Sequence, residues 1–242
     1  MSILVLGGTG EALKLAAVLA ARGMPALLSL ARRDRRAAET GLPVRTGGFG
    51  GGAGFRAFLC GQGIGAVMDA THPFAERITH RTVALCREAG VPYCRLERPE
   101  WTAGPGDRWT IVPDAEAAAG LIEPGEVAFL ATGRESLGAF AGLRESVIHC
   151  RVLTPTDEPF PLPRGGFVHG TAPFSVEGER ALFRALGVDW LILRNAGGEG
   201  PRAKLVAARE EGLRVAMIAR SAPPDAPCVT SVDAAVNWLE GI

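Results

Sequence analysis

Short apolar runs alternate with amphipathic runs along most of the chain, and this alternation limits the fold more than any other feature. Residues 2–23 predict a strand, a glycine turn and a helix, in which Leu13, Ala16 and Ala20 recur at helical spacing until Gly23. Strands joined to helices by short polar loops form βαβ units. The sequence therefore predicts an α/β fold with mainly parallel sheets and helices on both faces.

A segment rich in Pro, Gly and Trp, residues 99–125, interrupts this alternation. We expect it to be a hinge between an N-terminal lobe of residues 1–98 and a C-terminal lobe of residues 126–242, which would end with a helix over 232–241. Two Rossmann-like lobes would leave a cleft between them, and open α/β sheets bind ligands in such places.

Composition narrows the classes of ligand. The 26 Lys and Arg residues balance 26 Asp and Glu residues, so no global field attracts nucleic acid or a membrane surface. No segment reaches the ~20 apolar residues of a membrane span, and the apolar start lacks the basic region of a signal peptide. Five cysteines without a CxxC pair indicate free thiols rather than disulfides or zinc. We therefore expect a cytoplasmic protein.

A glycine-rich turn, Gly7-Gly8-Thr9-Gly10, connects the first expected strand to the first helix. Small residues let the backbone approach a pyrophosphate at the positive end of a helix, and Thr9 can add a hydroxyl. The GxGxxG pattern is incomplete because Leu13 stands at its third glycine position. A tight turn without a ligand is the alternative.

The second expected strand ends in Ser29, Arg32 and Arg33, where an NAD enzyme would offer a carboxylate to the ribose. The guanidinium fork of Arg32 or Arg33 suits a 2′-phosphate, and Ser29 can share that phosphate. This segment favours NADPH. A solvated basic loop is the alternative, since the charge run continues to Arg36.

Two further loops follow strands that we expect in the same sheet. Residues 47–52 are nearly all glycine, and residues 69–75 read DATHPFA. Because the carboxyl ends of parallel strands share one edge, these loops should converge with Gly7–Gly10 on a ligand-binding rim. In the DATHPFA loop, we expect Pro73 near the first helical position and Thr71 or His72 as the helix cap.

A metal site in this loop has little support. His72, Glu76 and His80 are four residues apart, which places them on one face of a helix. However, Pro73 falls among them and no further ligand lies nearby in the sequence. We expect no metal, and a Ser-His-Asp hydrolase is also poorly supported because GxSxG is absent.

In the second lobe, cations follow two expected strands. Arg134 ends one of them, Arg194 ends another, and Lys204 lies one helical turn beyond Pro201. These three side chains could bind the carboxylates of an acidic substrate. Isolated surface cations are an equal alternative when each residue is judged alone.

Taken together, these motifs resemble the precorrin-6A reductase family of cobalamin biosynthesis. The resemblance runs in order along essentially the whole chain through GGTGEA, SLA, GGFGG, DATHPFA, RLERPEW, ATGR and NAGG followed by Lys204. DATHPFA followed by LERPEW is its most specific part. The resemblance implies reduction of one double bond of the precorrin-6A macrocycle with NADPH, giving precorrin-6B. A relative in the anaerobic branch reduces the cobalt-containing counterpart.

Motifs and resemblance together divide the candidate site residues into two groups. The cofactor group comprises Gly7, Gly8, Thr9, Gly10, Glu11, Ser29, Arg32, Arg33, Gly47, Gly48, Phe49, Gly50, Thr71, His72 and Pro73. The substrate group comprises Phe74, Arg134, Arg194, Asn195, Gly197, Gly198 and Lys204. His72 and Lys204 are the candidate proton donors, with solvent as a competitor. The family commonly has Lys-Asn-Ser-Gly-Gly where this chain has Arg194-Asn-Ala-Gly-Gly198, so any role of that serine hydroxyl is lost or moved to Thr132.

Two other functions remain open at this point. One is reduction of a different, smaller acidic substrate, which would favour a tight pocket rather than broad glycine loops. The other is a non-catalytic NADP(H) sensor, which would not need the cationic, glycine-rich loops of the second lobe. For the leading hypothesis, contacts that hand the polycarboxylate macrocycle to or from neighbouring pathway enzymes are a further expectation.

Overall fold

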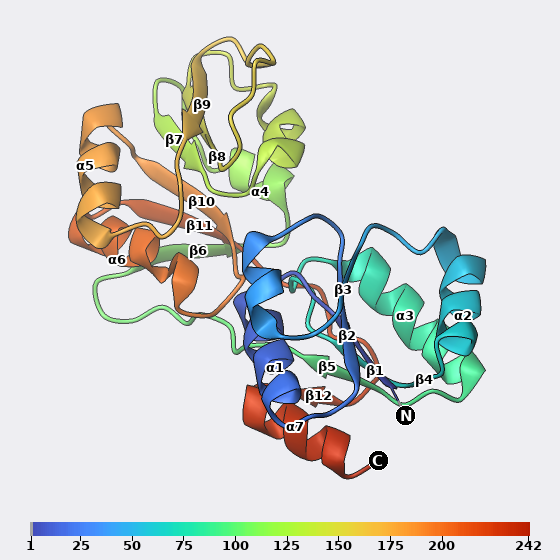
Figure 1. Cartoon of the computed structure of the whole chain (residues 1–242). Coiled ribbons are helices and arrows are strands. Elements are labelled where there is room, and N and C mark those ends of the chain that lie inside the picture. The colour runs from blue at the N-terminus through green and yellow to red at the C-terminus, as the bar shows by residue number, and fades with distance from the viewer. Residues whose placement is uncertain (1) are drawn as a thin grey trace. The chain divides into compact units, whose positions relative to one another are not determined.

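The computed structural model describes residues 2–242 and divides them into two α/β units. The first unit comprises the described residues up to Pro99 together with Ser221–Ile242, and the second comprises Glu100–Arg220. Each unit is built on a six-stranded sheet in which the paired strands run parallel (Figure 1). The predicted fold class is confirmed.

The first sheet has the strand order β12-β5-β4-β1-β2-β3. Its strands are β1 (Ser2–Leu6), β2 (Ala26–Leu30), β3 (Val44–Thr46), β4 (Ile64–Asp69), β5 (Tyr93–Leu96) and β12 (Cys228–Val229). The helices of this unit are α1 (Gly10–Ala21), the 3-10 helix η1 (Arg35–Thr40), α2 (Gly51–Gly61), α3 (Glu76–Ala89) and α7 (Val232–Glu240).

The central strand β1 explains why helices cover both faces of this sheet. Ile3 and Val5 belong to the apolar cluster that includes side chains of α1 and α7. Leu4 and Leu6 belong to a second cluster with side chains of α2 and α3. Because successive side chains of a strand point to opposite faces, an unbroken apolar run is buried on both sides. Figure 1 shows the two helix pairs on opposite sides of the strands.

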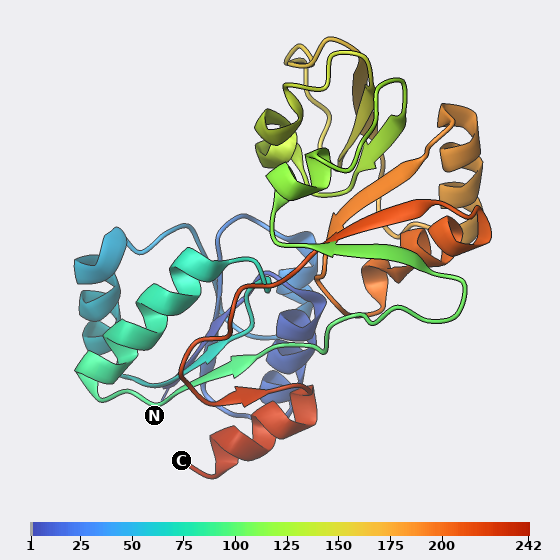
Figure 2. The ribbon, with the colours of Figure 1, turned by 180° about the vertical axis from the view of Figure 1, so that it is seen from behind.

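The second sheet has the order β6-β11-β10-β7-β8-β9. Its strands are β6 (Arg108–Val112), β7 (Val127–Leu130), β8 (Val147–Val152), β9 (Gly165–His169), β10 (Trp190–Arg194) and β11 (Arg214–Ile218). Its helices are α4 (Ala115–Ala119), η2 (Arg134–Phe140), α5 (Val176–Leu186), η3 (Gly200–Arg202) and α6 (Ala203–Glu210). Side chains of α5 and α6 share one apolar cluster with β7, β10 and β11. Figure 2 shows the ribbon of these helices and strands from behind.

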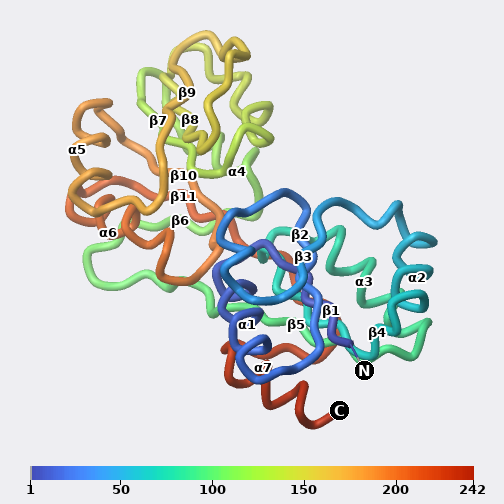
Figure 3. Tube along the Cα trace, viewed as in Figure 1, coloured from blue at the N-terminus to red at the C-terminus, as the bar shows by residue number. Residues whose placement is uncertain are grey.

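The division of the chain differs from the predicted boundaries of the lobes. The segment expected to be a hinge, residues 99–125, contains β6 and α4, which are parts of the second unit. The last helix, α7, was predicted in the second lobe but packs with α1 in the first unit, as the trace in Figure 3 shows. The strand β12 leads into it and is only two residues long, too short to show a hydrophobic period in the sequence.

All helices of the structure are short. The longest, α3, has 14 residues, and no helix in the described part of the chain is long and apolar enough to cross a bilayer. A membrane span needs ~20 consecutive apolar residues.

Candidate cofactor and substrate sites

Three glycine- or histidine-bearing loops meet along the carboxyl edge of the first sheet. The backbone N–H of Gly7 donates to Ser29 O (2.8 Å), and that of Gly47 donates to Leu30 O (2.9 Å). A Cβ on Gly8 would lie 3.6 Å from the backbone N of His72, so the turn after β1 touches the turn after β4. The structure thus brings together the loops whose convergence the sequence predicts.

Thr9 fixes the start of α1 and ties it to the turn after β4. It is the N-cap residue, and its hydroxyl accepts from Ala12 N (3.2 Å) while donating to Ala70 O (2.8 Å). The hydroxyl that the sequence offered to a phosphate is therefore already engaged. Glu11, in the first helical turn, accepts a hydrogen bond from Arg98 Nη1 (2.7 Å) and is likewise committed.

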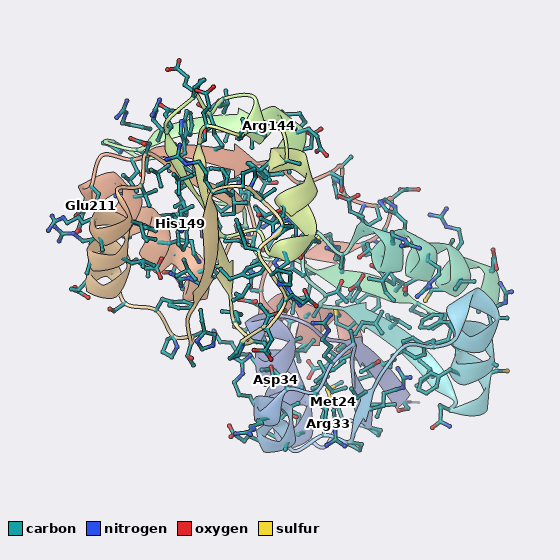
Figure 4. The ribbon with its side chains drawn as sticks, turned by 90° about the horizontal axis from the view of Figure 1, so that it is seen from above. Met24, Arg33, Asp34, Arg144, His149 and Glu211 are labelled. Atoms are coloured by element: carbon teal, nitrogen blue, oxygen red, sulfur yellow. The ribbon has the colours of Figure 1, made fainter. Side chains whose placement is uncertain are left out.

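Ser29, near the end of β2, was predicted to share a phosphate of the cofactor, but its hydroxyl already has a partner in the protein. Ser29 is buried, and its hydroxyl accepts from Arg45 Nη1 (2.8 Å). Arg32 and Arg33 are exposed, and neither has a hydrogen-bond or ion-pair partner in the described part of the chain. Asp34, labelled with Arg33 in Figure 4, pairs through its carboxylate with Arg36 instead.

Arg45, on β3, is a site residue that the sequence reasoning missed. Parallel pairing places it directly opposite Ser29, and its guanidinium donates to the backbone oxygens of Gly47 (3.1 Å) and Gly48 (2.9 Å). It also stacks on the ring of Phe49, with Cζ 4.0 Å from the centroid. The available signal was an arginine two residues before a glycine run, but only the strand register connects it to Ser29.

Phe49 anchors the glycine loop rather than extending freely from it. Its ring meets Phe55 edge-on at 4.8 Å and Phe58 at 5.1 Å between centroids. Gly47 and Gly50 flank it with φ values of +107° and +74°, which favour glycine. The loop after β3 is therefore held at its centre and kept small on both sides.

Asp69 is the fixed point of the DATHPFA loop. Its side chain is fully buried, and Oδ1 accepts from Thr71 N (3.0 Å) and Thr71 Oγ1 (2.7 Å). Oδ2 accepts from Thr79 Oγ1 (2.9 Å), Tyr93 OH (2.8 Å) and Arg95 Nη1 (3.1 Å). Burial, and then the negative charge of Asp69, raises the pKa of Tyr93, so its phenol stays a donor.

The start of α3 lies later than predicted. The helix begins at Glu76 after Ala75, which provides no side-chain cap. Neither expected residue caps the helix: Thr71 is held against Asp69 through its N–H and its hydroxyl, and His72 Nδ1 accepts from Phe74 N (3.3 Å) within the preceding turn. Within residues 2–242, no three His, Cys, Asp or Glu side chains gather as a metal site would require.

The exposed cations at the carboxyl edge of the second sheet carry carboxylate partners. Arg134 pairs with Glu158 (2.8 Å), and Arg194 pairs with Glu135 (3.2 Å). Both arginine side chains are partly accessible, at 47% and 30% exposure. Such exposed pairs are weak, so an incoming carboxylate can replace the protein's own at low energetic cost.

Asn195 is buried, unlike the two arginines, and holds the loop after β10 in place. Its Oδ1 accepts from Trp101 N (2.8 Å), and its Nδ2 donates to Trp101 O (3.0 Å) and Glu100 Oε2 (3.2 Å). Trp101 in turn donates through Nε1 to Gly198 O (2.8 Å). Because its amide groups are used, Asn195 fixes the loop after β10.

Lys204 is half-buried, near an ion pair that is itself buried. Its Nζ donates to Pro201 O (3.3 Å), and the nearby pair of Arg151 and Glu179 is buried with 3.0 Å between Nη1 and Oε1. Burial lowers the pKa of Lys204, the charge of Glu179 opposes this shift, and Arg151 adds to it. Sequence reasoning missed Arg151 and Glu179, although an arginine inside the apolar strand β8 was a usable signal.

Comparison with known proteins places these residues in a family. The model of the family described as "Precorrin-6x reductase CbiJ/CobK" matches residues 2–240. The precorrin-6A reductase of Rhodobacter capsulatus is 42% identical over 238 residues, 98% of this chain and 95% of that protein. The cobalt-precorrin-6A reductase of Salmonella typhimurium is 29% identical over 232 residues, 91% of this chain and 88% of that protein.

A solved structure agrees with these matches. The chain described as "CobK precorrin-6A reductase" has a TM-score of 0.91 and 40% sequence identity, covering 100% of this chain and 97% of that one. Sequence and fold thus match along the whole length, which confirms the resemblance drawn from the motifs. The protein belongs to the precorrin-6x reductase family and is an oxidoreductase.

Proposed function

We propose that this protein reduces precorrin-6A to precorrin-6B with NADPH, in the biosynthesis of cobalamin. The observation that carries the proposal is the 42% identity to a precorrin-6A reductase along 98% of the chain. The ligand-type loops along the carboxyl edge of the first sheet support a nucleotide site there, because open α/β sheets bind ligands at that edge.

The start of α1 fits the pyrophosphate of a nicotinamide cofactor. A Cβ on Gly10 would meet nothing within 4 Å, so the space at this helix start is open. The unpaired N–H groups of a first helical turn and the positive end of the helix dipole attract phosphate. In this proposal Gly7, Gly8 and Gly10 allow close approach, while Thr9 holds the turn in place.

The remaining cofactor contacts come from the neighbouring loops. Ser29, Arg32 and Arg33 lie at the position where Rossmann-type folds meet the adenosine ribose, which is the basis for preferring NADPH over NADH. The loop at Gly47–Gly50 and the turn at Thr71–Pro73 complete the cofactor side.

Reduction of a carbon-carbon double bond adds a hydride and a proton. Bound NADPH would supply the hydride. The protein's task is then to hold the two reactants in line and exclude water, which requires no nucleophilic side chain. The proton comes from His72, Lys204 or solvent. Lys204 suits this role because its lowered pKa makes its ammonium a stronger acid than that of an exposed lysine.

The second unit supplies the contacts to the macrocycle. Arg134, Arg194 and Lys204 would bind its carboxylates. Gly197 and Gly198 have φ values of +66° and +80°, a conformation that favours glycine in this loop. Asn195 contributes by holding this loop rather than by direct contact.

Reduction of the cobalt-containing counterpart is the second candidate activity. It has weaker support, because identity to the Salmonella typhimurium cobalt-precorrin-6A reductase is 29%, against 42% for the cobalt-free relative. We therefore place the cobalt-free substrate first.

An assay with authentic substrates tests both candidates. Purified protein is mixed under anaerobic conditions with NADPH and either precorrin-6A or cobalt-precorrin-6A, while the absorbance of reduced nicotinamide and the macrocycle spectrum are followed together. We expect one NADPH oxidised per precorrin-6A, and slower turnover with the cobalt form or with NADH. The absence of NADPH oxidation with precorrin-6A would remove the proposal, and faster turnover of the cobalt form would reverse the order of the candidates.

A further inference from the structure

Arg45, on β3, lies opposite the end of β2 and is held there by several contacts. Its Nη1 donates to Ser29 Oγ (2.8 Å) and Gly47 O (3.1 Å), and its Nη2 donates to Gly48 O (2.9 Å). The guanidinium also lies over the rings of Phe49 and Phe58, at 4.0 and 5.2 Å from their centroids. These contacts fix its plane before any ligand arrives.

The contacts of Arg45 leave part of its hydrogen-bonding capacity unused. A guanidinium has five N–H donors, and those of Arg45 that have acceptors lie on Nη1 and on one side of Nη2. Within residues 2–242, the Nε–H and one Nη2–H of Arg45 have no acceptor. Nε and Nη2 form the lateral fork of an arginine, which matches two oxygens of one phosphate.

The position of this fork selects one part of a dinucleotide. In doubly wound sheets the pyrophosphate lies at the first strand-to-helix turn, and the adenosine ribose lies near the end of the second strand. Arg45 is paired with Ser29, which lies near the end of β2, the strand next to the one that leads into Gly7–Gly10. Its unused donors are therefore placed for the ribose and its substituent.

Arg32 and Arg33 are less suited than Arg45 to be the main phosphate ligand, because their side chains are not held in place before binding. Both are exposed, and within residues 2–242 neither has a hydrogen bond, an ion pair or a ring contact that would fix its position. A long side chain that is ordered only on binding loses conformational entropy, whereas a side chain held in advance does not. Preorganisation thus favours the arginine on β3.

We propose that Arg45 is the residue that recognises the 2′-phosphate of NADPH and so sets the preference for this cofactor. This inference rests on the proposed function, because it assumes that the first unit binds NADPH. Ser29 and the loop carbonyls hold the guanidinium, and the lateral fork meets the phosphate. Arg32 and Arg33 add only a general positive field.

Calorimetric titration of the full chain with 2′,5′-ADP and 5′-AMP tests this assignment, because the two probes differ only in the 2′-phosphate. We expect the unmodified protein to bind 2′,5′-ADP more tightly. Arg45→Met should weaken 2′,5′-ADP binding by about tenfold or more, as expected for loss of charge-assisted hydrogen bonds, while 5′-AMP affinity changes less than about twofold. Arg45→Lys should fall between, since it keeps the charge without the fork.

Arg35→Met is the matched control, because Arg35 begins η1, is exposed, and makes no hydrogen bond or ion pair within residues 2–242. It should leave the ratio of the two affinities unchanged. If the unmodified protein shows no preference, the NADPH assignment and the role of Arg45 both fail. If the preference exists but survives Arg45→Met, only the role of Arg45 fails. Equal weakening of both probes by Arg45→Met would make it a support of the glycine loop and overturn its role in specificity.

Discussion

The carboxylate of Asp69 shows how a single buried charge can position a whole loop. It accepts five hydrogen bonds, from the backbone and hydroxyl of Thr71 and from the side chains of Thr79, Tyr93 and Arg95. A buried carboxylate is tolerated when a cation and several donors compensate its desolvation. The turn that carries His72 is consequently set from inside the protein, before any ligand binds.

Substitutions in the hydrogen-bond network around Asp69 should lower the free energy of unfolding by graded amounts. Tyr93→Phe deletes one neutral donor and should lower the free energy of unfolding by ~1 kcal/mol. Asp69→Asn removes the charge that Arg95 faces and should cost ~3–5 kcal/mol, because a buried guanidinium then loses a carboxylate partner. Urea unfolding monitored by circular dichroism gives both values. Equal effects of the two substitutions would contradict the central role of the carboxylate.

Lys204 combines poor solvation with a role in the proposed site, which predicts opposite effects on stability and activity. Burial lowers its pKa below the ordinary value of 10.5. Between the folded and unfolded pKa values the unfolded chain binds more protons, so the free energy of unfolding rises with pH through that window. Lys204→Met should therefore unfold at a higher temperature than the unmodified protein at pH 7, and the gap should narrow toward pH 10.

The other lysine of the chain, Lys14, is exposed on α1 and provides the control. Lys14→Met should change neither the melting temperature nor its dependence on pH. Lys204→Met should also lower turnover of precorrin-6A, while Lys14→Met should not. A Lys204→Met protein that is less stable at pH 7 would show that the ammonium is well compensated in the fold.

At the residue scale, the sequence predicted which residues lie in the turns at strand ends better than it predicted which side chains contact one another. The glycines and the DATHPFA turn were found because their residue types mark sharp backbone changes at strand ends. Arg45 and Glu179 were missed because their importance depends on which strands and helices are neighbours. That pairing is set by the packing of the whole unit and leaves no local pattern.

At the scale of elements, helix starts depend on side chains that can already be engaged elsewhere. For α1 the N-cap is Thr9, whose hydroxyl accepts from Ala12 N, although the sequence had suggested a phosphate contact for it. For α3 both expected caps are used by contacts inside the preceding turn, and the helix starts at Glu76 without one. Sequence alone does not show that Thr71 and His72 are held inside the turn before the helix.

Substitution of Thr9 tests the coupling between α1 and the turn after β4. Thr9→Ala removes both the cap and the bond to Ala70 O, and should lower the free energy of unfolding by ~1–2 kcal/mol. Thr9→Ser keeps the hydroxyl and should recover most of this loss. The affinity for NADP⁺, measured by calorimetry, should fall with Thr9→Ala and recover with Thr9→Ser. Unchanged affinity for NADP⁺ in Thr9→Ala would show that the N-cap of α1 does not contribute to cofactor binding.

At the scale of the whole molecule, the first unit is made from two distant parts of the chain. The helix α7 contributes Ala235, Val236 and Leu239 to the same core as α1, and β12 extends the sheet beside β5. The two-residue β12 has no hydrophobic period of its own, so its pairing could not be derived from the sequence. The general α/β architecture was predictable because each longer strand and helix carries its own period.

This organisation predicts which fragments fold. Residues 100–220 alone should unfold cooperatively on heating, because they contain every strand of the second sheet. Residues 1–99 alone should not, because one face of their core would lack α7. Joining residues 1–99 to residues 221–242 through a short flexible linker should restore a cooperative transition in differential scanning calorimetry. A cooperative transition for residues 1–99 alone would show that α7 is dispensable.

The interruption of the first unit by the second also affects how the protein is made. A ribosome must synthesise all of Glu100–Arg220 before β12 and α7 exist. Domains usually fold in the order in which they leave the ribosome. Here the second unit can fold as soon as its own residues emerge, while the first waits for its last strand and helix. The unit whose synthesis begins first is therefore the one that is completed last.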